Sequence, residues 1–168
     1  MPHHIETDLT KIKHLANIRN DENFRFRTFL KGKDGAIVDK IVHRLHQEIT
    51  AQIDCTQCGN CCQNLRPGIS TKDIEKFALS ECITSEEYKE RYCEKEDGIT
   101  YLKDIPCRYL NGKICSIYDE RPDECRSYPN THKNGFISRT WRMIDNYGIC
   151  PIVFNVMEGL KYELRFRR

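Results

Sequence analysis

Four cysteines gather within eight residues of this sequence, in the pattern Cys55-x-x-Cys58-x-x-Cys61-Cys62. Two-residue gaps let a loop turn back so that successive thiolates point at a common centre, as a metal site requires. Gly59 lies where the backbone must turn tightly and approach such a centre closely. The spacing therefore predicts that the chain binds a metal through cysteine thiolates.

Four more cysteines extend this pattern toward the C-terminus. Cys107 and Cys115 flank the dipeptide Asn111-Gly112, a hairpin-turn signal, so a short hairpin can bring their two thiols together. Further along the chain, Cys125 is followed by Arg126, and another cysteine stands directly before Pro151. The predicted metal ligands are Cys55, Cys58, Cys61, Cys62, Cys107, Cys115, Cys125 and Cys150.

Two metal assignments are open for these ligands. In the first, Cys55, Cys58 and Cys61 join a remote cysteine before proline, Cys150, on a 4Fe-4S iron–sulfur cluster, a spacing known from bacterial ferredoxins. The other four thiols would then form a second centre. In the second assignment, the eight cysteines divide into two tetrahedral zinc sites of four thiolates each. Arginines near the ligands in sequence could offset the negative charge in either case: Arg66, Arg108, Arg121 and Arg126.

Length, composition and net charge limit the other functions that the chain can be expected to have. The chain has 168 residues, is 39% hydrophobic and 31% charged, and so fits one compact globular domain. Its net charge of +2 predicts no strong electrostatic binding to nucleic acid or to anionic lipid. It contains neither a signal-peptide core nor an apolar run of membrane-spanning length, so we expect a cytoplasmic protein. In that reducing compartment, clustered cysteines are more often metal ligands than disulfides.

Other residues have plainer interpretations. Cys82 and Cys93 stand outside the tight spacing and are expected to be buried thiols that act as small apolar side chains. His43 and His46 lie three residues apart on a predicted helix, but no third ligand is visible near them in sequence. His132 follows Cys125 by seven residues and is an alternative to a cysteine ligand. The sequence identifies no catalytic residues.

Helices are predicted for the cysteine-free first 53 residues. The clearest begins at Asp34 or Gly35 and has one apolar face that includes Val38, Val42, Leu45 and Ile49. Another helix starts near Ser70 or Thr71. The sequence Thr84-Ser85-Glu86-Glu87 is typical of a capping box, with Thr84 as the cap.

The C-terminal part combines one hairpin with further helices. A strand is predicted over 99–102, and a short helix over 119–126 with Pro122 in its first turn. A longer helix is expected over 138–147, with Trp141 as a core anchor, and Pro151 opens the last helix. The expected fold class is mostly α, or α+β with one small hairpin. We expect a single domain over 1–168, with a helical segment (1–53), a metal-binding region (54–151) and a C-terminal helix (152–168).

The cysteine pattern and its flanking residues resemble a known family. After the first motif come Pro106-Cys107 and the run Cys115-x-Ile117-Tyr118-x-x-Arg121-Pro122-x-x-Cys125-Arg126-x-Tyr128-Pro129. Together these are similar to the YkgJ-type cysteine-cluster proteins with a CxxCxxCC motif, described as zinc- or iron-chelating. More distantly, the motif resembles that of the flagellin lysine N-methylases. The resemblance covers about Cys55 to Cys150 and implies metal chelation.

Three functions remain open from the sequence. The first is a metal-binding, iron–sulfur protein that transfers electrons or supports a protein-modification reaction. The second is a zinc protein with a structural or metal-carrier role. The third, which rests on the resemblance, is a lysine N-methylase-like enzyme, although no glycine-rich loop suited to S-adenosylmethionine follows a predicted strand. The expected partners are a metal ion or cluster and a protein partner or substrate, with no nucleic acid and no membrane.

Overall fold

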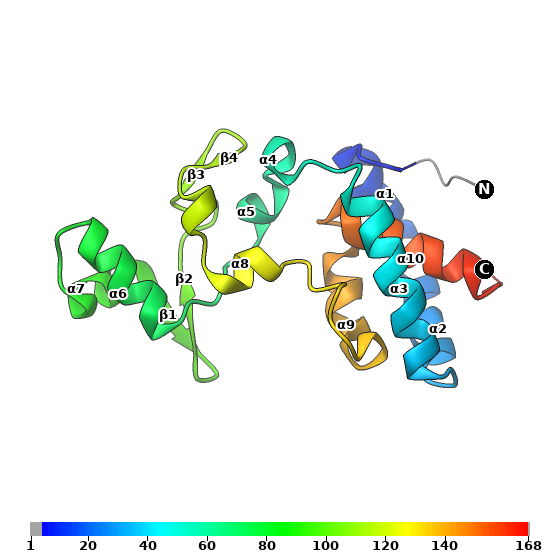
Figure 1. Cartoon of the computed structure of the whole chain (residues 1–168). Coiled ribbons are helices and arrows are strands. Elements are labelled where there is room, and N and C mark those ends of the chain that lie inside the picture. Colours follow the sequence, from blue (N-terminus) through cyan, green and yellow to red (C-terminus); the bar gives the residue numbers. More distant parts are fainter. Residues whose placement is uncertain (1–4, 168) are drawn as a thin grey trace. The chain divides into compact units, whose positions relative to one another are not determined.

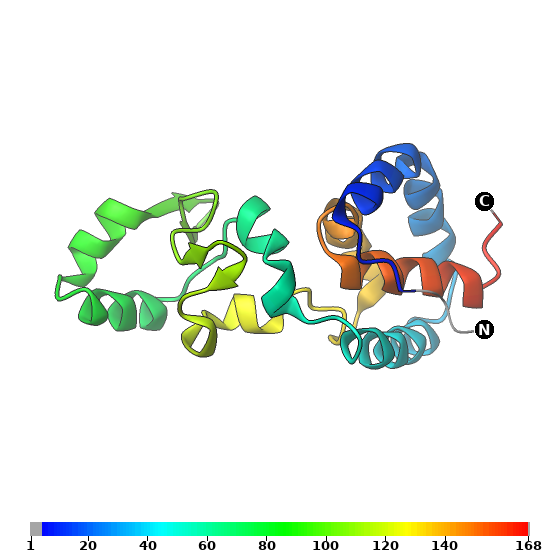
Figure 2. The ribbon, with the colours of Figure 1, turned by 90° about the horizontal axis from the view of Figure 1, so that it is seen from above.

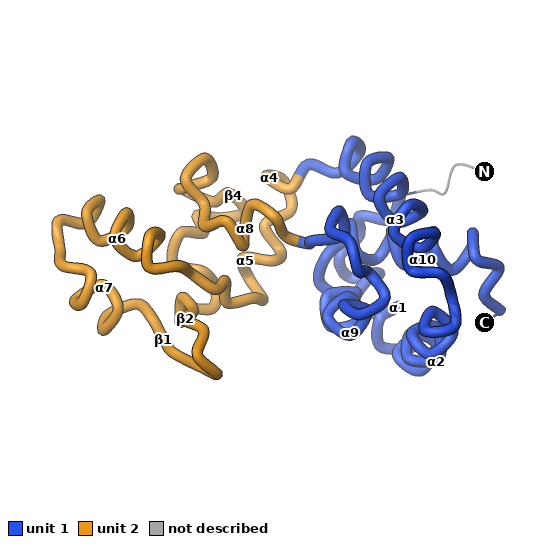
Figure 3. Tube along the Cα trace, turned by 60° about the horizontal axis from the view of Figure 1, so that its bottom comes forward, with its two compact units in different colours: residues 1–54, 129–168 blue, residues 55–128 orange. Residues whose placement is uncertain are grey.

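The computed structural model describes residues 5–167, and its fold is mostly helical with two small antiparallel hairpins (Figure 1). The predicted fold class is therefore confirmed. The contacts divide the chain into two compact units: unit 1 comprises residues 1–54 and 129–168, and unit 2 comprises residues 55–128 (Figure 3). Unit 2 is thus an insertion into the helical unit. Residues 129–151, which the sequence analysis assigned to the metal-binding region, lie in unit 1.

Unit 1 is built around a buried C-terminal helix. Its helices are α1 (Leu9–Ile18), α2 (Asn20–Leu30), α3 (Gly35–Thr50), α9 (Phe136–Tyr147) and α10 (Pro151–Glu163). Every residue from Ile152 to Met157 on α10 is buried, as expected of a helix enclosed by others. Figure 2 shows α10 between α3 and the pair α1 and α2. Asp34 caps α3 by accepting from the amides of Ala36 and Ile37, and the helix begins at Gly35, one of the two predicted start positions.

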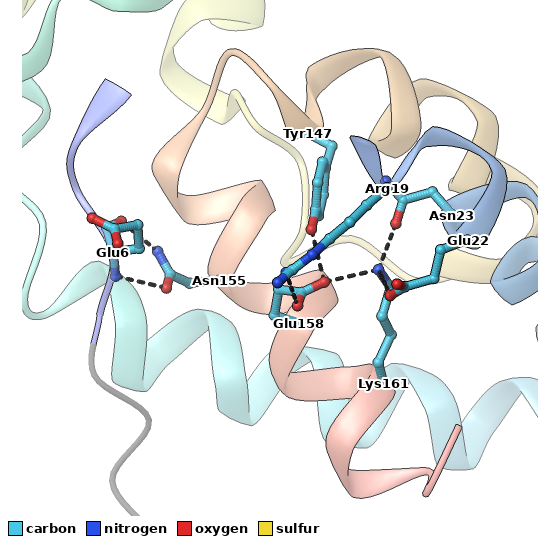
Figure 4. Close-up of polar contacts among 8 residues, drawn as sticks. All are labelled: Glu6, Arg19, Glu22, Asn23, Tyr147, Asn155, Glu158 and Lys161. Carbon is cyan, nitrogen blue, oxygen red and sulfur yellow. Dashed lines mark hydrogen bonds and ion pairs between the residues drawn. The ribbon is translucent and has the colours of Figure 1, made fainter. Parts of the chain in front are cut away.

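Charged side chains are buried inside unit 1 and pair with one another (Figure 4). The Lys161 side chain is only 3% exposed, and its Nζ donates to Glu22 at 2.9 Å and to Glu158 at 2.8 Å. Glu158 also accepts from the Tyr147 hydroxyl at 2.7 Å and from Arg19 at 2.5 Å. Two carboxylates and two cations balance in this network, which offsets the cost of removing each charge from water.

Unit 2 has a smaller core, built from two capped helices and one hairpin. Ile74, Phe77, Tyr88 and Leu102 are among its most buried residues. The predicted capping box at Thr84 is confirmed, and Ser70, at the predicted start of the preceding helix, forms a second complete capping box. The elements are α4 (Cys55–Cys58), α5 (Asn60–Asn64), α6 (Thr71–Ser80), α7 (Ser85–Tyr92), β1 (Cys93–Glu96), β2 (Ile99–Leu102), β3 (Leu110–Asn111), β4 (Ile114–Cys115), the 3-10 turn η1 (Tyr118–Glu120) and α8 (Asp123–Ser127).

Two local predictions in unit 2 need correction. The expected helix over 119–126 is broken into η1 and α8, because Arg121 has an extended ψ of 148°, as a residue before proline prefers. Pro122 is therefore the N-cap of α8 and not part of its first turn. The hairpin turn is also displaced by one residue: Asn111 pairs with Ile114, so Gly112 takes the first central position, with φ of +63°.

Trp141 was predicted to anchor the core, and this is wrong. The residue is 52% exposed on α9 and contacts Phe24 edge-on at 5.3 Å between ring centroids. The buried positions of α9 include Phe136, Met143 and Tyr147, which lie on another side of the helix. Among residues 5–167, no helix has the length and apolar character needed to cross a membrane.

Candidate metal centre

Seven of the eight predicted ligands belong to unit 2, and the eighth belongs to unit 1. All ten cysteines lie in the described part of the chain, and none forms a disulfide. Cys150 is the N-cap residue of α10 in unit 1, where it is 6% exposed. The unit 2 cysteines occupy short helical turns, a loop and a strand: Cys55 and Cys58 on α4, Cys61 and Cys62 on α5, Cys107 before β3, Cys115 on β4 and Cys125 on α8.

Gly59 makes the turn that joins the first two cysteines to the next two. Its φ of +60° lies in the left-handed region, where glycine is favoured because it has no Cβ. A Cβ added at Gly59 would lie 2.5 Å from the carbonyl oxygen of Lys113 in the β3–β4 turn. The CxxC loop therefore packs backbone to backbone against the hairpin that carries Cys115.

Backbone hydrogen bonds tie the later cysteines to Cys62. The Cys107 amide donates to the Cys62 carbonyl at 2.8 Å, and the Leu110 amide donates to the Cys107 carbonyl at 2.9 Å. Leu110 in turn pairs with Cys115 across the hairpin. The hairpin thus links Cys107 and Cys115 to α5 through the backbone.

Cys62 lies at the centre of the cysteine group: it contacts Cys61, and its charge acts on the thiols of Cys107, Cys115 and Cys125. Its Sγ lies 3.9 Å from the Cys61 Sγ, and this hydrogen bond, together with the nearby Arg121 charge, lowers the pKa of Cys62 to about 7. Burial, together with the charges of Cys62, Cys107 and Cys115, raises the pKa of Cys125 to about 12. Burial and the Cys62 charge also act to raise the pKa values of Cys107 and Cys115.

This electrostatic coupling has a direct chemical consequence. Cys62, Cys107, Cys115 and Cys125 lie close enough that ionising one thiol opposes ionising the next. A bound cation would reverse this, because metal ligation requires the deprotonated thiolate and neutralises it. The donor set fits soft, thiolate-binding metals such as zinc or iron in a cluster. As the side chains stand, no three His, Cys, Asp or Glu residues within 5–167 form a closed ligand group, so ligation requires side-chain rotation.

Arg121 is a predicted arginine whose charge acts on two of the proposed ligands, Cys62 and Cys115. Its Nε donates to the Tyr118 carbonyl at 2.7 Å, and its guanidinium stacks 3.5 Å from the centroid of the Tyr118 ring. Held in this way, its positive charge acts to lower the pKa values of Cys62 and Cys115. The same fixed charge would stabilise bound thiolates.

The other three arginines have different partners. Arg66 pairs with Glu94 at 2.5 Å and with Glu96 at 2.6 Å on the β1 strand. Arg108 pairs with Glu81 at 3.0 Å and stacks on an aromatic ring of α7. Arg126 donates to backbone carbonyls of Arg121 and Asp119. These contacts connect elements within unit 2 and stabilise its fold.

Cys93 and Cys82 differ from each other. Cys93 is partly buried and packs against the unit 2 core, as a small apolar side chain does. Cys82 was also expected to be buried, but it is exposed and has a φ of +55° just after the α6 helix. It lies at the end of a helix, where the chain reverses direction toward α7, so the core does not cover it.

Three histidines meet in unit 1, which the sequence analysis did not anticipate. His43 and His46 lie on α3, and the His132 ring lies 5.3 Å from the His46 ring between centroids. The spacing of His43 and His46 was visible in the sequence. The third histidine was not, because His132 lies 86 positions after His46 in the chain and most of the intervening segment forms unit 2.

Comparisons with known proteins agree with the chemistry of the cysteines. Residues 54–150 match the family model CxxCxxCC, whose description is "Putative zinc- or iron-chelating domain". The match covers all eight predicted cysteine ligands and more than half of the chain. No curated protein and no solved structure matches the chain.

Proposed function

Because the chain belongs to the CxxCxxCC family of zinc- or iron-chelating domains, we propose that its cysteines hold an iron–sulfur centre of the 4Fe-4S type. The centre would transfer electrons or support a protein-modification reaction. The observation that carries this proposal is the gathering of thiols around Cys62 in unit 2. The cytoplasm is the proposed location, since a reducing compartment keeps these thiols available.

The proposed ligands form two groups of four. Cys62, Cys107, Cys115 and Cys125 make the first group, because each of the last three thiols senses the charge of Cys62. The second group contains Cys55, Cys58 and Cys61 on the turns around Gly59. Its fourth ligand, Cys150, is proposed on the sequence spacing alone.

The spacing of the second group supports iron–sulfur chemistry. Three cysteines at two-residue gaps with a remote Cys-Pro pair suit a 4Fe-4S cluster, which supplies one-electron chemistry when bound. Around the first group, the chain's own residues provide the positive charge of Arg121 and backbone hydrogen bonds from Tyr109 to Cys107 and from Ile117 to Cys115. Charge and hydrogen bonds of this kind tune the reduction potential of a thiolate centre.

Zinc is the second candidate, and one distance favours it. Two thiolates on one tetrahedral zinc ion, each at about 2.3 Å, have sulfurs about 3.8 Å apart. The Cys61 and Cys62 sulfurs are separated by 3.9 Å. A zinc centre would give a structural or metal-carrier role without redox chemistry. The lysine N-methylase-like activity rests on resemblance and stays a prediction.

One experiment separates iron–sulfur from zinc and tests the ligands. The protein is purified without oxygen, its iron, zinc and inorganic sulfide are measured, and its absorbance is recorded before and after dithionite. Iron with equimolar sulfide and bleaching by dithionite supports the proposal, whereas zinc without sulfide overturns the redox role. Replacing Cys125→Ser should lower the metal content, and Cys82→Ser, at an exposed cysteine outside the ligand set, should not. Equal metal in both variants would remove Cys125 from the centre.

A further inference from the structure

The histidine trio of unit 1, His43, His46 and His132, contains none of the proposed cysteine ligands. His43 and His46 project from one face of α3, since residues three apart on a helix are neighbours. His132 lies in the segment between Pro129 and α9, in the same unit. We propose that His43, His46 and His132 form a second metal site that binds a first-row divalent transition-metal ion, such as Zn²⁺, through imidazole nitrogens.

The spacing of the rings suits a shared ion. Imidazole nitrogens bind Zn²⁺ at about 2.1 Å, which places two rings on one tetrahedral ion with centroids about 5 Å apart. The His46 and His132 centroids are 5.3 Å apart and their planes are inclined by 47°. The charge of His43 reaches both of the other rings. As the side chains stand, the trio is not a closed ligand group among residues 5–167, so the proposal requires the His43 and His132 side chains to rotate toward a shared ion.

His46 is already oriented as a metal ligand would be. Its Nδ1 forms a 2.7 Å hydrogen bond with the hydroxyl of Thr131, which is fully buried. Metal-binding histidines usually use their second ring nitrogen in this way, because the bond fixes the tautomer and the ring orientation. Nε2 of His46 is then the nitrogen available to the ion.

His43 supplies the second indication of a ligand. Its Nε2 is buried and has no hydrogen-bond partner among the described residues, which is a costly state for a polar nitrogen. The same residue lines an open groove of about 620 Å³ together with Asp39, Gln47 and Asn134. The groove gives an ion and a water ligand a route to the ring. A metal ion would satisfy the buried nitrogen.

The segment that carries His132 is held rigidly in place. Arg139 on α9 donates to the carbonyl of Asn130 at 2.7 Å and to the carbonyls of Lys133 and Asn134. Asp39 on α3 accepts from the amides of Gly135 at 2.7 Å and Phe136 at 2.9 Å. Such support preorganises a ligand before the ion arrives.

The charges around the trio select the kind of ion. Lys133 and Arg139 face His132, and Lys40 and Arg44 line the groove beside His43, so a cation held only by charge would be disfavoured. Asp39 is the carboxylate at the groove, and it is already engaged with backbone amides. Imidazoles bind zinc, nickel and copper but not magnesium or calcium, so the site is expected to discriminate against the last two.

Nuclear magnetic resonance of the full-length protein tests the site without a mutation. Zn²⁺ is added stepwise to anaerobically purified, ¹⁵N-labelled protein, and ring nitrogens are followed in long-range proton–nitrogen spectra. We expect the His43, His46 and His132 ring nitrogens to shift together to metal-bound positions at one added equivalent. His14, an exposed histidine on α1, serves as the internal control. If the trio responds no more than His14, the proposal is overturned.

Variants then assign the ligands and separate this site from the cysteines. His46→Gln and His132→Gln should each lose the added Zn²⁺ equivalent, measured by competition with a chromophoric chelator. Thr131→Val should weaken binding about tenfold, since it removes only the orienting hydrogen bond. His14→Gln should bind as the wild type does. Cys125→Ser should retain the histidine response, so failure of either metal site can be recognised independently. Unchanged Zn²⁺ affinity in His46→Gln would refute the site.

Discussion

Unit 1 and unit 2 both bury groups that prefer water, but they compensate for this burial differently. In unit 1, the buried Lys161 and the partly buried Arg19 pair with Glu22 and Glu158, so cations and anions from the chain balance each other. In unit 2, thiols crowd around Cys62 and oppose one another's ionisation. There the compensating positive charge is, in our proposal, a metal centre.

This difference indicates where each unit obtains its stability. Unit 1 encloses α10 on several sides and contains many fully buried apolar side chains. The unit 2 core is a small cluster around Tyr88 and Phe77, to one side of the short cysteine-bearing turns. Small domains with limited cores commonly depend on bound metals. We therefore expect unit 1 to be stable by itself and unit 2 to depend on its metal.

The largest expected effect of a substitution is in the buried network of unit 1. Lys161→Ala would leave Glu22 and Glu158 without their shared cation, at a cost of about 3–5 kcal/mol in the free energy of unfolding. Lys13→Ala, at an exposed position on α1, should change stability by no more than about 0.5 kcal/mol. Urea unfolding monitored by circular dichroism measures both. Equal effects of the two substitutions would contradict the role of the network.

The next effect concerns the turn between α4 and α5 in unit 2. Gly59→Ala combines a left-handed backbone with a 2.5 Å approach to Lys113, and should cost more than about 2 kcal/mol and lower the metal content. Gly98→Ala shares a positive φ but meets no atom within 4 Å, so about 1 kcal/mol is expected. Metal analysis and thermal unfolding distinguish the two. Similar losses in both variants would show that close packing on the hairpin is unimportant.

Helix caps offer a matched pair of smaller changes, one in each unit. Thr84→Ala removes the cap of α7, and Asp34→Ala removes the cap of α3, each at about 1 kcal/mol. If the units unfold separately, Thr84→Ala should shift only the transition of unit 2 and Asp34→Ala only that of unit 1. Calorimetry of the metal-loaded protein resolves these transitions. A single transition that both variants shift equally would contradict separate unfolding.

The smallest expected effect is a pH dependence of unit 1. Burial by itself raises the pKa of Glu158, but Lys161, Tyr147 and Arg19 together bring it below its usual value of 4.5. A lowered folded-state pKa gives stability that is present above about 4.5 and is lost as the pH falls through the folded-state value. Glu158→Gln should therefore flatten the acid side of the unit 1 stability curve. An unchanged acid slope in this variant would assign the loss to other carboxylates.

Local signals in the sequence predicted much of this structure. Asp34, Ser70 and Thr84 marked helix starts correctly, because a cap acts within its own first turn. The helix expected over 119–126 was wrong because the restriction imposed by Pro122 on Arg121 outweighed helical propensity.

Tertiary arrangements were harder to predict. The backbone link between Cys62 and Cys107 spans 45 residues, and only the hairpin signal suggested part of it. Trp141 was assigned to the core from its residue type alone, although the face of α9 that is buried decides its exposure. The meeting of His46 with His132 depends on how the chain returns to unit 1 after unit 2, which no local pattern encodes.

Hydrogen exchange on the full-length protein tests the contrast between the units most directly. The anaerobically purified, metal-loaded protein is compared with the same protein after removal of its metal by a chelator. We predict that metal removal greatly speeds amide exchange across residues 55–128 and leaves α3, α9 and α10 protected. Unchanged protection of residues 55–128 without metal would contradict the account.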